Sequence, residues 1–219
     1  MLTDSQRHMA APTGPRLLPM EISTGAGRAR AEVDEVDRPR FLLVLTHGAG
    51  GGVASADLMA ARQAGLDSGG AVARVLQPYR VGGARAPGSP LRQDAAWLDI
   101  IGALRASLPG VPLVQGGRSN GARVACRTAQ MARAAGVIGL AFPLHPPGKA
   151  GVPEKSRAPE LRSAGVPVLV INGDRDPFGV PDPADVDQLV VLRGQTHALS
   201  GQGAAIVSAV ATWLARLHF

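Results

Sequence analysis

The segment Gly117-Arg118-Ser119-Asn120-Gly121 places a serine between two glycines, each two positions away from it. This G-x-S-x-G pattern is typical of a serine on a tight turn between a strand and a helix. The turn strains the serine backbone, and side chains at the two flanking positions would collide, which favours glycine at both. A helix that begins behind the serine directs free N–H groups and its positive end toward developing negative charge. Ser119 is therefore a candidate nucleophile for attack on an acyl carbon.

The pattern alone is weak evidence, because a chain with 28 glycines can match it by chance. Acyl chemistry also needs a base, an acid that orients the base, and N–H donors for the oxyanion. After a serine of this kind, the acid precedes the histidine in the chain. Of the three later histidines, His145 precedes the plausible acids and His218 adjoins the C-terminus. His197 lies between the expected final strand and final helix, and we predict that it is the base.

Two aspartates, Asp174 and Asp176, follow the preceding expected strand. One of them can orient His197 while the other caps the turn or pairs with Arg175. Spacing alone does not choose between them.

The N–H donors are expected from a glycine-rich segment, residues 47–50, which follows an earlier strand. Glycine lets backbone N–H groups approach a substrate closely. We therefore predict that the oxyanion is bound by the N–H groups of Ala49 and Asn120.

Short apolar runs that suit buried strands alternate with segments that have helical character. Strands are expected at 41–46, 71–76, 111–115, 137–142, 166–171 and 188–192, and helices at 55–68, 91–108, 120–135, near 159–163 and at 203–217. An edge hairpin is expected from 19–23 and 29–36 around 24–27, and 77–90 is expected to be a polar loop. This alternation predicts an α/β fold, a mostly parallel twisted sheet with helices on both faces. Right-handed crossovers would place every candidate residue at one sheet edge.

The length of 219 residues suits one domain, expected at 19–219 after a flexible tail at 1–18. The net charge of +6 invites a nucleic-acid partner, but the chain has only two lysines and its arginines are scattered, so none is expected. Cys126 cannot form an internal disulfide and is expected to be a small buried residue in a reducing, cytoplasmic setting. No membrane span, metal or cofactor is expected, and the protein is expected to be a monomer or a homodimer.

Four strings carry a resemblance to a known family: Thr46-His-Gly-Ala-Gly50, Gly116-Gly-Arg-Ser-Asn-Gly-Ala-Arg-Val-Ala125, Phe142-Pro-Leu-His-Pro-Pro-Gly-Lys149 and Gly173-Asp-Arg-Asp-Pro-Phe-Gly179. From about residue 40 to its end, the chain resembles the α/β-hydrolase superfamily. More narrowly, it is similar to the small dienelactone-hydrolase-like branch that contains the testis-expressed-30 and KAT8-complex-subunit-3 hydrolase domains.

The resemblance implies a carboxylesterase-like serine hydrolase without a lid domain, in which Asp176 is the acid. Asn120 departs from the family pattern, where methionine is expected, and Ala122 stands where glycine is common. A polar Asn120 side chain would reshape the acyl pocket and leave the backbone donor intact. Because some members of the branch are parts of larger assemblies, a non-catalytic interaction module is an alternative, and acyl transfer by the same triad is another.

The connection after the strand at 137–142 leaves room for one loop and a short helix, which favours a small soluble ester, lactone or thioester as the substrate. Arg80, Arg118 and His145, with Arg85, are candidates for positive charge at the mouth of the site, and His47 is a further candidate substrate contact. The alternative is that the arginines are solvated or paired with nearby acids.

Overall fold

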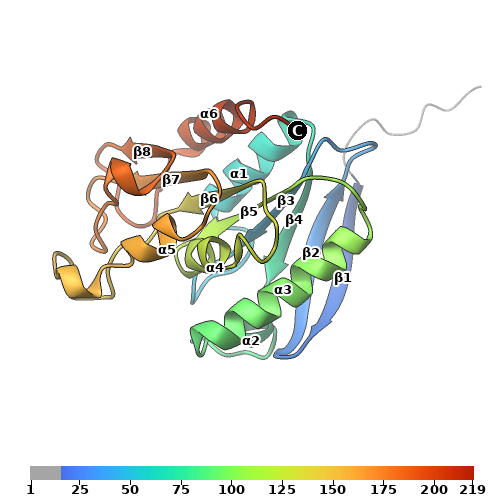
Figure 1. Ribbon diagram of the computed structural model, residues 1–219, viewed down its shortest axis with the longest axis horizontal. Coiled ribbons are helices and arrows are strands. Elements are labelled where there is room, and N and C mark those ends of the chain that lie inside the picture. The colour runs from blue at the N-terminus through green and yellow to red at the C-terminus, as the bar shows by residue number, and fades with distance from the viewer. Residues whose placement is uncertain (1–15) are drawn as a thin grey trace, which may run out of the picture.

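The computed structural model describes residues 16–219, and one eight-stranded sheet forms its centre (Figure 1). The strands are β1 (Arg16–Thr24), β2 (Gly27–Glu35), β3 (Leu42–Thr46), β4 (Ala71–Leu76), β5 (Leu113–Arg118), β6 (Gly136–Leu140), β7 (Val168–Gly173) and β8 (Gln188–Leu192). Their order across the sheet is β1-β2-β4-β3-β5-β6-β7-β8. The pairs β1–β2 and β2–β4 are antiparallel and all others are parallel, so the carboxyl ends of β3 to β8 meet at one edge.

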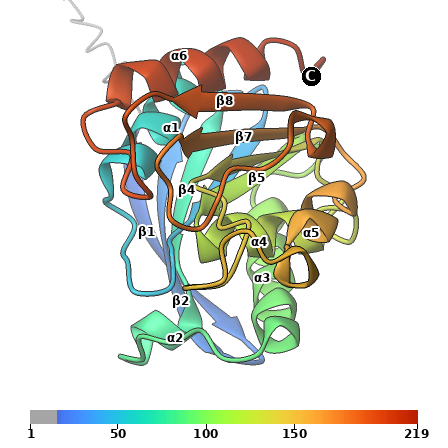
Figure 2. The ribbon, with the colours of Figure 1, turned by 90° about the vertical axis from the view of Figure 1, so that its left-hand side faces the viewer.

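Helices cover both faces of the sheet, as Figures 1 and 2 show. They are α1 (Ala56–Asp67), α2 (Pro78–Val81), α3 (Pro90–Ala106), α4 (Asn120–Thr128), α5 (Ala158–Arg162) and α6 (Gly203–Leu214), with 3₁₀ turns η1 (Pro153–Lys155) and η2 (Pro183–Asp185). Apolar residues of α3, α4 and α5 pack on one face, where Trp97 is fully buried. Those of α1 and α6 pack on the other, around Trp213. The predicted α/β architecture is thus confirmed.

Several boundaries differ from those predicted. Strand β1 begins at Arg16, so residues 16–18 of the predicted tail belong to the sheet, while residues 1–15 of that tail lie outside the described residues. The predicted polar loop 77–90 contains the short helix α2, which begins with Pro78. The predicted helix 120–135 ends at Thr128 and is followed by turns.

Gly136, expected to end that helix, instead begins β6 beneath the C-terminal helix. A methyl group on Gly136 would lie 2.6 Å from the ring of Trp213, so the glycine is required by close packing. Helix α6 itself ends at Leu214, three residues earlier than predicted.

A buried glutamine joins three elements beneath the Ser119 turn. Gln115 of β5 accepts a hydrogen bond of 3.0 Å from the Trp97 indole N–H of α3. Its amide N–H₂ donates to the Ala125 carbonyl of α4 at 2.7 Å. Buried polar groups are costly unless bonded, so these partners fix α3 and α4 relative to the strand that leads into the turn.

Strands β5 and β6 approach so closely that one glycine of β5 has no room for a side chain. A methyl group on Gly116 would lie 2.5 Å from the carbonyl oxygen of Ile138, the residue with which it is paired. Gly139 on β6 is different, because the nearest atom to an added methyl group would be 3.5 Å away, at ordinary contact distance.

We predict that Gly116→Ala lowers the free energy of unfolding by about 1 to 3 kcal/mol, since the backbone of β6 must move to admit the methyl group. Gly139→Ala is the matched control and should change it by less than about 1 kcal/mol. Urea denaturation of both variants measures the difference. Equal stability of the two variants would contradict the close approach.

Candidate active site

Ser119 lies at the carboxyl end of β5, in the turn that leads into α4, and its backbone is strained. Its φ of 53° and ψ of −114° lie outside the helical and extended regions. Its N–H donates to the Leu140 carbonyl at 2.9 Å, which holds the turn against the end of β6. A residue held in such a conformation costs about 1 to 3 kcal/mol and persists only where its surroundings impose it.

The surroundings that impose it are the two glycines of the pattern. A methyl group on Gly117 would lie 2.6 Å from the carbonyl oxygen of Thr46, and one on Gly121 would lie 2.7 Å from the same oxygen. Both glycines therefore let the turn pack directly against the end of β3. A methyl group on Gly48 would lie 3.2 Å from the Ser119 Cβ, so the segment after β3 also lies beside the serine.

The structure brings His197 and Asp176 together with Ser119 from three different strand ends. The His197 Nε2 lies 3.0 Å from the Ser119 Oγ, and its Nδ1 lies 2.8 Å from the Asp176 Oδ2. The carboxylate accepts at Nδ1, so Nδ1 carries the proton and Nε2 is free to accept from the hydroxyl group. Of the two candidate acids, Asp176 is the one that contacts His197, while Asp174 is exposed.

Asp176 is held in place by its own loop. The Asp176 side chain is fully buried, and its Oδ1 accepts a hydrogen bond of 2.9 Å from the Phe178 N–H. Phe178 packs edge-on against the His197 ring, with the ring centroids 4.5 Å apart. Asn172, near the end of β7, donates to the carbonyls of Phe142, after β6, and Gly179, and so ties the Asp176 loop and the segment after β6 to the sheet.

The predicted N–H donors come from two segments, since Ala49 lies in the loop after β3 and Asn120 is the first residue of α4. Within residues 16–219, the N–H groups of Ala49 and Asn120 have no hydrogen-bond partner. The Ala49 carbonyl accepts from the Tyr79 hydroxyl group at 3.1 Å, which fixes the orientation of that loop. Burial raises the pKa of Tyr79 to about 12, so the phenol stays protonated and remains a donor.

The prediction that His47 contacts substrate is wrong, because the ring is fully buried and both of its nitrogens are engaged. Nδ1 lies 2.7 Å from the Gly48 carbonyl, and Nε2 accepts from the Gln77 N–H at 3.0 Å. These partners require a neutral ring with its proton on Nδ1. Burial lowers the pKa of His47, and the positive charge of Arg80 lowers it further.

The basic residues expected at the mouth are also bound to the protein itself. The Arg80 guanidinium donates to the carbonyls of Gly51 and Ala84, at 3.0 and 3.1 Å. The Arg118 guanidinium lies 2.7 Å from the Asp57 carboxylate and donates to the His197 carbonyl at 2.7 Å. Arg118 is therefore paired with a nearby acid, as the alternative held, while Arg80 is bonded to backbone carbonyls, which neither expectation foresaw.

His145 is buried under the Asp176 loop, which corrects its assignment to the mouth. Its N–H donates to the Phe178 carbonyl at 2.9 Å, and its ring packs against Gly179. The ring lines a separate cleft with Ser156, Arg162 and Asp185. Cys126 is buried as expected, and burial raises the pKa of its thiol to about 12, so it remains uncharged.

Sequence reasoning missed several residues that shape the site. Tyr79, Phe178, Asp57 and Gln93 lie far apart in the chain and were given no role. Gln93 accepts a hydrogen bond of 2.8 Å from the Asn120 side chain, which explains how a polar residue is accommodated beside the serine. Only Phe178 carried a signal, since it belongs to the Arg-Asp-Pro-Phe-Gly string.

Among residues 16–219, no three histidine, cysteine, aspartate or glutamate side chains are grouped so that they could hold a metal ion. In the same part of the chain, no helix combines the length and the apolar character needed to cross a bilayer.

A family model described as "Alpha/beta hydrolase domain" matches residues 39–200, and the chain belongs to this family. The predicted superfamily is thus confirmed. No curated protein was found to match the sequence significantly.

Solved structures with the same fold include esterases and serine hydrolases. Est1E from Butyrivibrio proteoclasticus is 18% identical with a TM-score of 0.72, over 91% of this chain and 98% of that one. XC6422 from Xanthomonas campestris, described as an a/b serine hydrolase without lid, is 20% identical with a TM-score of 0.67, over 93% and 98%. A dienelactone hydrolase from Anabaena variabilis is 16% identical with a TM-score of 0.68, over 93% and 97%. The last agrees with the dienelactone-hydrolase-like branch, while the narrower likeness to the testis-expressed-30 and KAT8-complex-subunit-3 domains stays a prediction.

The burial of His47 predicts a specific loss of stability in acid. Because the native pKa lies below the unfolded value of about 6.5, the unfolded state binds the proton first as the pH falls. The contribution of neutral His47 is therefore complete above about pH 6.5 and is lost as the pH falls toward its lowered native pKa.

We expect His47→Gln, which cannot titrate, to show a smaller decline in the free energy of unfolding between about pH 7.5 and pH 5 than the wild type. Urea denaturation at a series of pH values measures this decline. His218→Gln is the control, because His218 is exposed, and it should retain the wild-type slope. A wild-type slope in His47→Gln would show that His47 is not buried as the neutral ring.

Proposed function

We propose that the protein is a serine hydrolase that cleaves small soluble esters, lactones or thioesters through an acyl-enzyme. The observation that carries the proposal is the unbroken chain of contacts from Ser119 to His197 and Asp176, at 3.0 and 2.8 Å. A non-catalytic interaction module would tolerate a distorted contact between serine and histidine. The undistorted contact, together with the unpartnered N–H groups beside it, favours catalysis.

The residues perform the reaction in two halves. His197 Nε2 takes the proton of the Ser119 hydroxyl group as Oγ bonds to the acyl carbon, and the oxyanion accepts hydrogen bonds from the N–H groups of Ala49 and Asn120. The bond to the leaving group then breaks, and His197 gives that group its proton. In the second half a water molecule gives its proton to His197 and adds to the acyl carbon, and the acid departs as Ser119 recovers its proton. Throughout, Asp176 keeps the proton on Nδ1 and stabilises the imidazolium.

A cavity of about 240 Å³ is lined in part by the residues that bond the two donor residues, and we assign it to a small acyl group. Its lining includes Tyr79, which bonds the Ala49 carbonyl, and Gln93, which bonds the Asn120 side chain. The rest of the lining is mostly alanine, proline and glycine: Ala26, Pro78, Ala84, Ala86, Pro87, Gly88 and Ala96, with Gln77 and Arg92.

The side on which this cavity lies favours the acyl group as its occupant. The leaving group must stand next to His197, which protonates it, and His197 follows β8. The cavity adjoins the end of β4. In the sheet order, β4 and β8 lie on opposite sides of β5, the strand that leads to Ser119. The acyl group, which extends away from the leaving group, is therefore directed toward the cavity. Its volume is below the usual range of about 300 to 1,000 Å³ for ligand pockets, which favours short chains.

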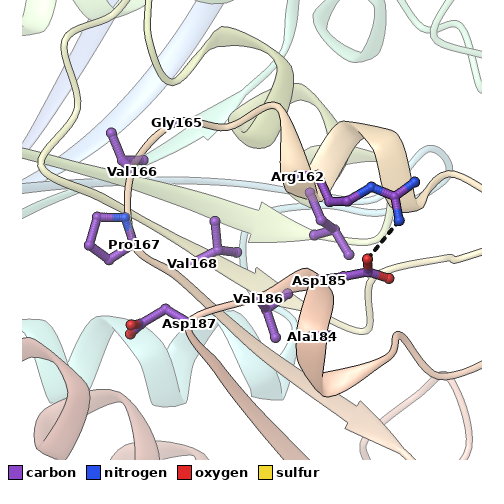
Figure 3. A pocket seen from close by; sticks show the side chains of 10 residues that line it. Arg162, Gly165, Val166, Pro167, Val168, Ala184, Asp185, Val186 and Asp187 are labelled. Carbon is purple, nitrogen blue, oxygen red and sulfur yellow. Dashed lines mark hydrogen bonds and ion pairs between the residues drawn. The ribbon is translucent and has the colours of Figure 1, made fainter.

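Two further clefts lie away from the Ser119 turn. One, of about 480 Å³, is lined by α5, η2 and the amino end of β7 (Figure 3). The ion pair between Arg162 and Asp185 crosses it at 2.8 Å. Because the amino ends of the strands lie at the sheet edge opposite Ser119, this cleft serves as a remote control site for substitutions.

The first test is covalent labelling. We expect a fluorophosphonate probe to modify Ser119, with the modified peptide identified by mass spectrometry. Ser119→Ala should lose the label and reduce ester hydrolysis by about 10³-fold or more, because it removes the nucleophile. A folded wild-type protein that takes up no label would sink the proposal. If activated esters acylate the protein but release acid only when an amine or alcohol is added, the reaction is acyl transfer.

The second test concerns acyl length. Ala86 is exposed at the rim of the cavity, so Ala86→Phe should fill the cavity without disturbing the core. We expect kcat/KM for p-nitrophenyl hexanoate to fall at least about 10-fold more than kcat/KM for the acetate, since one or two lost methylene sites are worth about 1 to 3 kcal/mol. Ala184→Phe in the remote cleft should leave the ratio unchanged. An equal loss for both esters in Ala86→Phe would place the acyl group elsewhere.

A further inference from the structure

Arg118 precedes Ser119, and its guanidinium contacts three separate parts of the site. The Nε lies 2.7 Å from the Asp57 Oδ2 as an ion pair without hydrogen-bond alignment. One terminal nitrogen donates to the His197 carbonyl at 2.7 Å. The other lies 3.5 Å from the position that a methyl group on Gly48 would occupy, beside the donor loop. A single side chain thus joins the serine turn, the histidine loop and the loop after β3.

The His197 peptide itself has few other attachments, although its loop is held on either side by the Gln195 carbonyl, which accepts from the Arg175 N–H at 2.9 Å, and by the buried Leu199. His197 lies in turns between β8 and α6, outside any regular element. Within residues 16–219, the hydrogen bond from Arg118 is the only one made by the backbone of His197. The ring contacts with Ser119 and Asp176 fix the imidazole but do not bond the peptide behind it. Arg118 supplies that bond.

Asp57 holds the guanidinium where it can reach this carbonyl. The Asp57 side chain is 1% exposed, in the first turn of α1, and its Oδ1 accepts a hydrogen bond of 2.9 Å from the Leu58 N–H. The carboxylate therefore has a fixed orientation. It also neutralises the arginine charge, so the guanidinium can lie next to the His197 peptide without opposing a positive charge on the imidazole.

We propose that Arg118, oriented by Asp57, is a positioning residue that fixes His197 relative to Ser119. The inference rests on the proposed function, in which the distance between these two side chains governs proton transfer. Displacing a catalytic group by about 1 Å can cost about 100-fold in rate. Arginine is required because a lysine, with one nitrogen at the end of its chain, cannot bond both partners in this fork geometry.

The chain offers a matched control in a second buried arginine–aspartate pair. Arg62 of α1 pairs with Asp34 of β2 at 2.6 Å. The side-chain exposures are 19% and 1%, against 20% and 1% for Arg118 and Asp57. Arg62→Ala and Arg118→Ala therefore break ion pairs of equal burial, and only the second removes the hydrogen bond to the His197 carbonyl.

We expect both variants to lose stability in urea denaturation, Arg62→Ala at least as much because it also loses two hydrogen bonds to Asp34, and only Arg118→Ala to react slowly with the fluorophosphonate probe. Its labelling rate should fall about 10- to 100-fold, while Arg62→Ala stays within about 3-fold of the wild type. Guanidinium ion at millimolar concentration should restore part of the rate in Arg118→Ala and leave Arg62→Ala unaffected. Arg118→Lys should remain slow. Wild-type labelling by folded Arg118→Ala would overturn the proposal.

A measurement that needs no activity separates this proposal from the proposed function. In protein with ¹⁵N-labelled histidine, the Nδ1–H proton of His197 is assigned as the low-field signal that His197→Gln abolishes. We expect this signal to broaden or vanish in Arg118→Ala and to persist in Arg62→Ala. If the wild type takes up no probe, the hydrolase proposal fails and the signal still decides the role of Arg118. A sharp, unchanged signal in Arg118→Ala would overturn that role.

Discussion

The carbonyl oxygen of Thr46, at the end of β3, is the fixed point against which the Ser119 turn packs. Gly117 and Gly121 both approach it more closely than any side chain would allow. This contact forces the positive φ of Ser119, since the chain must turn sharply to leave β5 and enter α4 without colliding with β3. It also brings the loop after β3 beside the serine. The strained backbone of Ser119 and the placement of the loop beside it are therefore consequences of one steric constraint.

The parts of this arrangement that could be predicted from the sequence are those carried by local patterns. Apolar runs such as 41–46 identified the parallel strands, and the glycines around Ser119 identified the turn. Chain order then predicted His197 as the base, and the structure places its Nε2 3.0 Å from the Ser119 Oγ. The choice between Asp174 and Asp176 could not be made from spacing, because it depends on how the loop after β7 folds over Asn172. The role of Gly136 as the first residue of β6 was missed, because the residue that leaves no room for a side chain there, Trp213, lies far along the chain.

The arginines near the site also could not be predicted correctly, because most of their contacts are distant in the sequence. A positive mouth was a reasonable expectation for a chain with a net charge of +6, yet Arg80 and Arg118 bond inward to carbonyl groups and a carboxylate. Their partners come from other elements, so nothing in the local sequence reveals them. His47 was misassigned for a related reason, since the Gln77 N–H that occupies its Nε2 belongs to the segment after β4. In this protein, polar side chains near the site mainly stabilise loops.

The contact between Asn120 and Gln93 has a consequence for sequence divergence. Both side chains are buried, and each satisfies a polar group of the other. A methionine at position 120 would leave the Gln93 carbonyl oxygen without that donor, and a leucine at position 93 would leave the Asn120 amide without its acceptor. The two positions should therefore vary together among relatives: polar with polar, apolar with apolar. A family tree would then divide at this pair into lineages in which the cavity lined by position 93 differs in polarity.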